Sequence, residues 1–281
     1  MSVAGTNGRA LPWALVTPAL AWTLLFFVLP FIAMGLSSLT AHEGGAFTLT
    51  NYSQFFTDPS YWRAMVNSLE VTAVVTAISI LLAYPFAWIL AEQVPERWQR
   101  LALMLAVLPF WTSYVVRSYS WLLVLAQNGV INRALAGLGL VAEPLQLANT
   151  RFATVTGFVH FFVMLLTLTI FANLKQLSPS YRKAAADLGA GPVRIFLHVV
   201  LPLTLPGIMV GAFLTFVLCI GDYITPQILG GNNELVMPQL VMMQIGRRGD
   251  FPLASALSII LMAVVTVAYL ACARWLKIER T

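Results

Sequence analysis

The sequence predicts an all-α membrane protein with six transmembrane helices and a cytoplasmic pair of short helices between helices four and five. Hydrophobic residues make up 59% of its 281 residues, and charged residues only 10%. A soluble domain has roughly a quarter of its residues charged. We therefore expect lipid to be the main solvent of this chain. Its net charge of +5 is small and its basic residues are scattered, so we expect no nucleic-acid partner.

Six apolar runs are each long enough for a span of about 20 residues. They lie near residues 13–38, 66–91, 101–127, 152–174, 203–226 and 253–276. Six spans return the chain to its starting side, so both termini are expected on one face of a multi-pass protein.

The basic residues of the loops predict which face that is. One side carries ten of them: Arg9, Arg97, Arg100, Lys175, Arg182, Lys183, Arg194, Arg274, Lys277 and Arg280. The other carries five: Arg63, Arg133, Arg151, Arg247 and Arg248. Because cytoplasmic loops carry the excess of lysine and arginine, we expect both termini to be cytoplasmic.

Residues 178–202 between the fourth and fifth runs predict two short, capped helices. Ser178 is placed as the N-cap and Pro179 in the first turn, where its missing N–H costs nothing. Gly189 can supply a left-handed C-terminal cap. A second helix is expected from 193 to 200, with Pro202 and a later Pro206 marking its turn into the fifth span.

The first of these helices has the features of a docking surface. Tyr181, Ala184, Ala185 and Leu188 fall on one face, with small residues at its centre. Small side chains let another surface approach closely, so we expect a protein partner here.

These residues carry a resemblance to a known family. The order Ala184-Ala185-x-Asp187-Leu188-Gly189, followed by Leu201-Pro202, resembles the cytoplasmic loop of ABC importer permeases of type I. Further blocks resemble the spermidine/putrescine-type branch, and they lie at residues 84–88, 108–112, 117–121, 203–208 and 221–226. The resemblance extends from about residue 62 to residue 276.

The resemblance implies a permease subunit of a bacterial cytoplasmic (inner) membrane. It implies a second homologous permease subunit, with a heterodimer as the expected pairing, an ATPase dimer and an extracytoplasmic binding protein as partners. It also implies three parts: residues 1–61 with the first span, a permease domain at 62–276, and a tail at 277–281. The expected ATPase-coupling residues are Lys183, Ala184, Ala185, Asp187, Gly189, Leu201 and Pro202.

Lys183 departs from the family, in which the loop usually begins with glutamate. Asp187, one turn later, can pair with Lys183 or supply the negative charge. Alternatively the glutamate is dispensable and Lys183 is simply solvated. We therefore place the coupling on the shape of the Ala184, Ala185 and Gly189 surface.

Three ionisable residues fall within or at the rim of the predicted spans, namely Glu70, Arg117 and Asp222. A charge at membrane depth costs at least about 2.5–3.5 kcal/mol, so it requires a partner or a water-filled cavity. One interpretation is a polar vestibule that receives a charged solute. The other is that Arg117 pairs with Glu70 or Asp222 and locks helices together. Nearby aromatic candidates for a solute path are Trp111, Tyr114 and Tyr223.

Both the resemblance and these carboxylates favour a small cation such as putrescine or spermidine as the solute. Permeases for opines, phosphonates, thiamine or iron remain alternatives. The sequence contains no G-x-x-x-x-G-K-[ST] nucleotide motif and no paired His/Cys spacing, so ATP hydrolysis is expected in a partner, with no cofactor or metal in this chain. A stand-alone secondary carrier would use Glu70 or Asp222 as a proton site. It would also be expected to show inverted repeats, and we find none.

Overall fold

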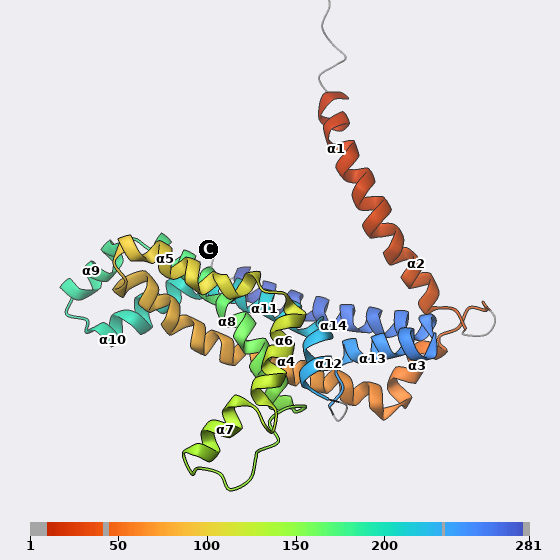
Figure 1. The fold of residues 1–281 in the computed structure, drawn as a ribbon. Coiled ribbons are helices and arrows are strands. Elements are labelled where there is room, and N and C mark those ends of the chain that lie inside the picture. Colours follow the sequence, from red (N-terminus) through yellow and green to blue (C-terminus); the bar gives the residue numbers. More distant parts are fainter. Residues whose placement is uncertain (1–9, 42–44, 232–233, 278–281) are drawn as a thin grey trace, which may run out of the picture. The chain divides into compact units, whose positions relative to one another are not determined.

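The computed structural model describes residues 10–41, 45–231 and 234–277, without the side chains of 10–15 and 272–277. Apart from an isolated β-bridge between Thr40 and Phe47, its regular elements are helices (Figure 1). The expected all-α class is confirmed. Contacts divide the chain into two units, one with residues 1–59 and 241–262, the other with 60–240 and 263–281.

The first unit begins with one long helical rod. It consists of α1 (Ala10–Thr23), a π-helical segment (Leu24–Val28) and α2 (Leu29–Ser38). Of this rod, 23 residues from Val16 to Ser38 are apolar enough to cross a membrane, which agrees with the expected first span. A short helix, α3 (Thr50–Thr57), is held to its end by Asn51, whose Nδ2 donates to the carbonyls of Ser38 at 2.8 Å and Thr40 at 2.9 Å.

Long apolar helices form the second unit. They are α4 (Pro59–Trp88) with a π-helical extension (Ile89–Gln93), α8 (Arg151–Gln176) and α11 (Leu201–Ile220). The last helix, α14 (Phe251–Lys277), and the shorter α13 (Met237–Met243) with its π-helical end (Gln244–Arg248) belong partly to each unit. Shorter helices are α7 (Val130–Gly137), α9 (Pro179–Asp187), α10 (Pro192–Ile195) and α12 (Ile224–Leu229).

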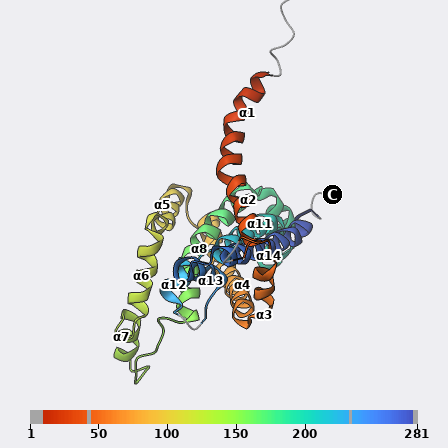
Figure 2. The ribbon, with the colours of Figure 1, turned by 90° about the vertical axis from the view of Figure 1, so that its right-hand side faces the viewer.

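The expected third span is a bent pair of helices. One helix was expected over 101–127, but α5 (Glu96–Val107) and a 3-10 turn (Leu108–Trp111) meet α6 (Tyr114–Leu125) at 90°. Thr112 and Ser113 are extended at the break, and Thr112 Oγ1 donates to the Pro109 carbonyl at 2.7 Å. Figure 2 shows α7 at the end of α6 away from the bend. With this pair as one span, the described chain has six candidate spans.

The expected separate helix at 193–200 is also corrected. Residues 192–220 form one span of 29 residues, through α10, a π-helical segment (Phe196–Val200) and α11. The Leu201 N–H donates to the Phe196 carbonyl, five residues back, directly before Pro202. The same arrangement occurs at Leu29 and Leu24, directly before Pro30. A proline ring clashes with the carbonyl four residues back in an α-helix, and the wider π turn removes that conflict.

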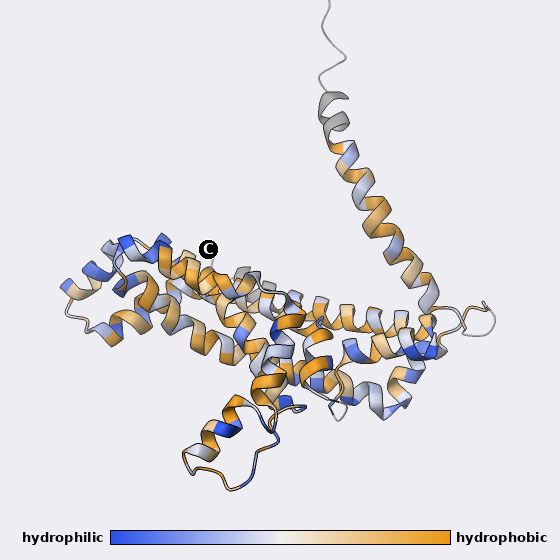
Figure 3. Cartoon of the chain, viewed as in Figure 1, coloured by the Kyte–Doolittle hydropathy of each residue, from blue (hydrophilic) through white to orange (hydrophobic). Residues whose placement is uncertain are grey.

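Helices α8 and α11 pack closely in the second unit. Their shared core includes Leu166, Ile170 and Ile208, all buried. Gly207 permits the approach, because a Cβ atom there would lie 2.1 Å from the side-chain amide carbon of Asn173. Hydrophilic residues gather at the end of this unit that carries α9, whereas the long helices are mainly hydrophobic (Figure 3).

We predict that Gly207→Ala destabilises the protein by about 1–3 kcal/mol, as overpacking does, although alanine alone favours a helix by about 0.5–1 kcal/mol. Gly137→Ala in α7 is the matched control, since a Cβ there meets no atom within 4 Å. Thermal unfolding of the purified variants measures the difference. Equal melting temperatures would show that α8 and α11 do not meet at Gly207.

Candidate functional site

Helix α9 is capped at both ends as the sequence predicts. Ser178 Oγ accepts from the backbone N–H of Ser180 at 3.3 Å, and Pro179 occupies the first turn. Gly189 has a φ of 80°, in the left-handed region, and the chain reverses there. This conformation is strained for any residue with a Cβ atom.

The surface of α9 is open. None of its residues is buried, and Leu188, directly after it, is 89% exposed. The candidates Lys183, Ala184 and Asp187 lie on α9 and are exposed, while Ala185 is half-buried. Gly189 follows the helix, and the remaining candidates, Leu201 and Pro202, lie at the start of α11.

An ion pair between Arg182 and Glu92 joins α9 to the end of the α4 span. The two side chains are only 27% and 25% exposed, respectively. The Arg182 guanidinium carbon also lies 5.9 Å from the centroid of the Trp88 ring. The sequence marks Arg182 only as a loop charge and gives no sign of Glu92 as its partner, because a pair separated by 90 residues leaves no local pattern.

Aromatic contacts continue from this ion pair into the span region. Trp88 and Tyr84 each meet the Phe196 ring edge to face, with centroids 5.5 Å apart. The Tyr84 hydroxyl lies 3.1 Å from Thr204 Oγ1 on α11. Arg182 is thereby connected through packed side chains to α4, to the π-helical turn before Pro202 and to α11.

The charged candidates in the spans have partners other than those expected. Glu70 accepts a hydrogen bond from Arg151 at 2.7 Å, and Arg151 also lies 3.8 Å from Glu234. Arg117 instead donates to the Pro109 carbonyl at 3.2 Å. The expected pairing of Arg117 with Glu70 or Asp222 is thus not formed.

Asp222 accepts three hydrogen bonds at the start of α12. The Tyr114 hydroxyl donates to Oδ2 at 2.6 Å, the backbone N–H of Ile224 donates to Oδ1 at 2.8 Å, and that of Thr225 to Oδ2 at 3.3 Å. These bonds satisfy the first N–H groups of α12 and connect it to α6. Asp222 therefore has a structural role, whatever its contact with a solute.

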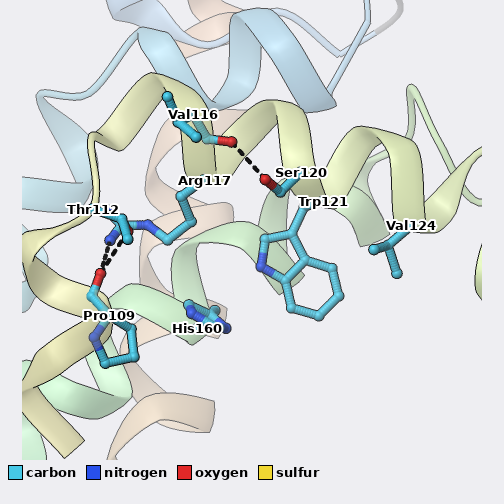
Figure 4. A pocket seen from close by; sticks show the side chains of 8 residues that line it. All are labelled: Pro109, Thr112, Val116, Arg117, Ser120, Trp121, Val124 and His160. Carbon is cyan, nitrogen blue, oxygen red and sulfur yellow. Dashed lines mark hydrogen bonds between the residues drawn. The ribbon is translucent and has the colours of Figure 1, made fainter. Parts of the chain in front are cut away.

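Arg117 lies among aromatic rings and lines a cavity. Its guanidinium carbon is 5.0 Å from the Tyr114 ring centroid and 4.6 Å from that of Phe161, and the residue is only 8% exposed. The cavity has a volume of about 340 Å³ (Figure 4). Its lining residues are Pro109, Thr112, Val116, Arg117, Ser120, Trp121, Val124 and His160. His160 meets Trp121 edge to face, with centroids 5.6 Å apart.

The three aromatic candidates, Trp111, Tyr114 and Tyr223, lie outside this lining. Trp111 is 83% exposed, at the end of the 3-10 turn before the bend. Tyr223 is also exposed and directly follows Asp222. Of the eight lining residues, only Arg117 was among the predicted site residues. The others come together at the bend between α5 and α6, which no periodic pattern indicates.

Comparison with known proteins identifies the family. The model of the binding-protein-dependent transport system inner membrane component matches residues 6–277, almost the entire chain. The chain belongs to this family. The spermidine/putrescine transport system permease protein PotB of Escherichia coli (strain K12) is 30% identical over 271 residues, which cover 94% of this chain and 98% of PotB.

A second relative and a solved structure are also similar to this chain. The inner membrane ABC transporter permease protein YdcU of Escherichia coli (strain K12) is 34% identical over 237 residues, covering 80% of this chain and 74% of YdcU. The fold matches a chain of a bacterial ABC transporter involved in the import of the acidic polysaccharide alginate, with a TM-score of 0.79 and 17% identity over 97% of this chain and 96% of that one.

We predict that Asp222→Ala lowers the melting temperature more than Asp222→Asn. Alanine leaves the Tyr114 hydroxyl and two N–H groups without their acceptor, at about 1–3 kcal/mol for each buried group. Asparagine retains an acceptor oxygen at the helix start. Thermal unfolding tests this order, and its reversal would contradict the cap.

Solute uptake by the intact Asp222→Asn complex tests whether the charge of Asp222 binds solute, since unchanged uptake would exclude a solute-binding carboxylate.

Proposed function

We propose that this permease forms the transmembrane path of an ATP-driven importer for a small organic amine, with putrescine and spermidine as the first candidates. The similarity to PotB carries this proposal, because it extends over nearly the full length of both chains. A binding protein outside the membrane would deliver the solute, and a second, homologous permease would complete the path.

The exposed α9 is proposed as the ATPase docking surface. It has no buried residue, it is capped at Ser178 and Gly189, and small side chains lie along it. A partner that contacts Ala184 and Ala185 closely would move α9, while Lys183 remains a solvated charge at its edge. Residues 62–276 would form the permease domain, and the tails at 1–9 and 278–281 lie outside the described residues.

The proposed orientation places α9 and both termini in the cytoplasm. It follows from the two-to-one excess of basic residues on that side. Two of those residues, Arg9 and Arg280, are outside the described part of the chain. The hydrophilic character of the α9 end agrees with a position outside the hydrocarbon layer (Figure 3).

Arg182 is proposed to transmit movement of α9 to the spans. Its ion pair with Glu92 acts on α4, and the rings of Trp88, Phe196 and Tyr84 continue the contact to Thr204 on α11. Packed side chains in two discrete arrangements are a physical route for such coupling.

Reconstitution tests the import function. The chain is co-purified with the candidate partner permease, ATPase subunits and binding protein, and incorporated into liposomes. We expect uptake of radiolabelled putrescine or spermidine only with ATP and binding protein present. Uptake by this chain alone, driven by a proton gradient, would instead establish a secondary carrier.

A charge exchange tests the transmission. We predict that Arg182→Gln and Glu92→Gln each reduce ATP-driven uptake several-fold while ATP hydrolysis continues. The ATPase subunits would then hydrolyse ATP without moving the membrane-spanning helices. The double variant Arg182→Glu with Glu92→Arg should recover part of the uptake. Solute imported per ATP is the measurement. A proportional loss of hydrolysis and uptake, without recovery in the exchange variant, would contradict the role.

A further inference from the structure

Arg117 is a buried cation whose described contacts include no carboxylate. Its contacts are the Pro109 carbonyl and the rings of Tyr114 and Phe161. A guanidinium has five N–H donors, and charged side chains at membrane depth pair with an opposite charge or a backbone carbonyl, or face a water-filled cavity. Arg117 also lines the 340 Å³ cavity, so a group entering that cavity can reach the charge.

The acidic candidates are engaged elsewhere. Glu70 is paired with Arg151. Asp222 accepts from the Tyr114 hydroxyl and from two backbone N–H groups. The described lining of the cavity contains no carboxylate. A solute with an ammonium group at each end would therefore meet a guanidinium here and no opposite charge.

The lining provides complementary groups for two different ends of a solute. The planar guanidinium of Arg117 matches a carboxylate in shape and charge. Trp121 offers an aromatic face, which attracts an alkylammonium group. The Ser120 hydroxyl donates to the Val116 carbonyl at 2.8 Å, so its oxygen remains able to accept from that ammonium group (Figure 4).

We propose that this cavity, between α6 and α8, binds an amino carboxylate during transport, with the carboxylate on Arg117 and the ammonium group toward Trp121 and Ser120. Its volume is within the range of about 300–1,000 Å³ that holds small ligands. The proposal rests on the import function above but replaces its first candidates, putrescine and spermidine, by an amine that also carries a carboxylate.

Two matched solutes test the proposal. Putrescine and 4-aminobutyrate are similar in length, and they differ in carrying an ammonium group or a carboxylate at one end. Thermal unfolding of the purified permease–ATPase complex, without binding protein, is measured against each. We expect 4-aminobutyrate to raise the melting temperature in a concentration-dependent way, and putrescine at the same concentration to have no effect.

Variants of Arg117 assign the effect to the cavity. Arg117→Gln should abolish the stabilisation, and Arg117→Lys, which retains the charge without the planar fork, should weaken the apparent affinity about tenfold. Arg133→Gln is the matched control, because Arg133 is exposed on α7 and outside the lining. If the permease–ATPase complex does not assemble with Arg117→Gln, the apparent affinity of the Arg117→Lys complex for 4-aminobutyrate tests the proposal.

Three results would overturn the proposal: equal stabilisation by putrescine, equal stabilisation by acetate, or an unchanged affinity in Arg117→Lys. Uptake into liposomes separates this failure from that of the import function. ATP-driven uptake of 4-aminobutyrate that is unaffected by Arg117→Lys would refute the carboxylate site and leave the importer intact. An absence of ATP-dependent uptake of polyamines and amino carboxylates alike would refute the importer itself.

Discussion

The hydrocarbon layer offers no hydrogen-bond partners, and the second unit is organised around that constraint. At three interruptions of its helices, the chain supplies local replacements for lost backbone bonds. Thr112 bonds the Pro109 carbonyl at the bend, and Asp222 accepts the free N–H groups of α12. Before Pro202, a π turn maintains a bonded ladder. The bend and the start of α12 therefore each depend on one nearby polar side chain, Thr112 or Asp222.

The sequence was sufficient to predict the class, the approximate spans and the caps of α9, because these follow from local patterns. Apolar runs report hydrophobic burial, and Ser178, Pro179 and Gly189 are local conformational signals. The bend was missed although Pro109 and the polar pair Thr112 and Ser113 interrupt the apolar run, because the whole stretch has the length of one span. The helix end expected before Pro202 was wrong because a proline stops an α-helix only if the backbone cannot widen.

The charged residues were recognised, but their partners were not. Glu70 pairs with Arg151, Arg182 with Glu92, and Asp222 with Tyr114. These partners are 81, 90 and 108 residues apart in sequence, so only the packing of helices brings them together. The arginines therefore differ in their partners. Arg151 and Arg182 are neutralised by carboxylates of the chain, whereas Arg117 retains its charge beside a cavity.

The π turn before Pro202 also determines how α9 faces its surroundings. A π turn contains one more residue than the α-helical turn it replaces, and each residue of an α-helix advances the azimuth by about 100°. Loss of a single residue from Phe196–Val200 would therefore rotate α10, and α9 with it, by about 100° around the span axis. The direction in which α9 points is thus encoded by the length of this segment as well as by its side chains.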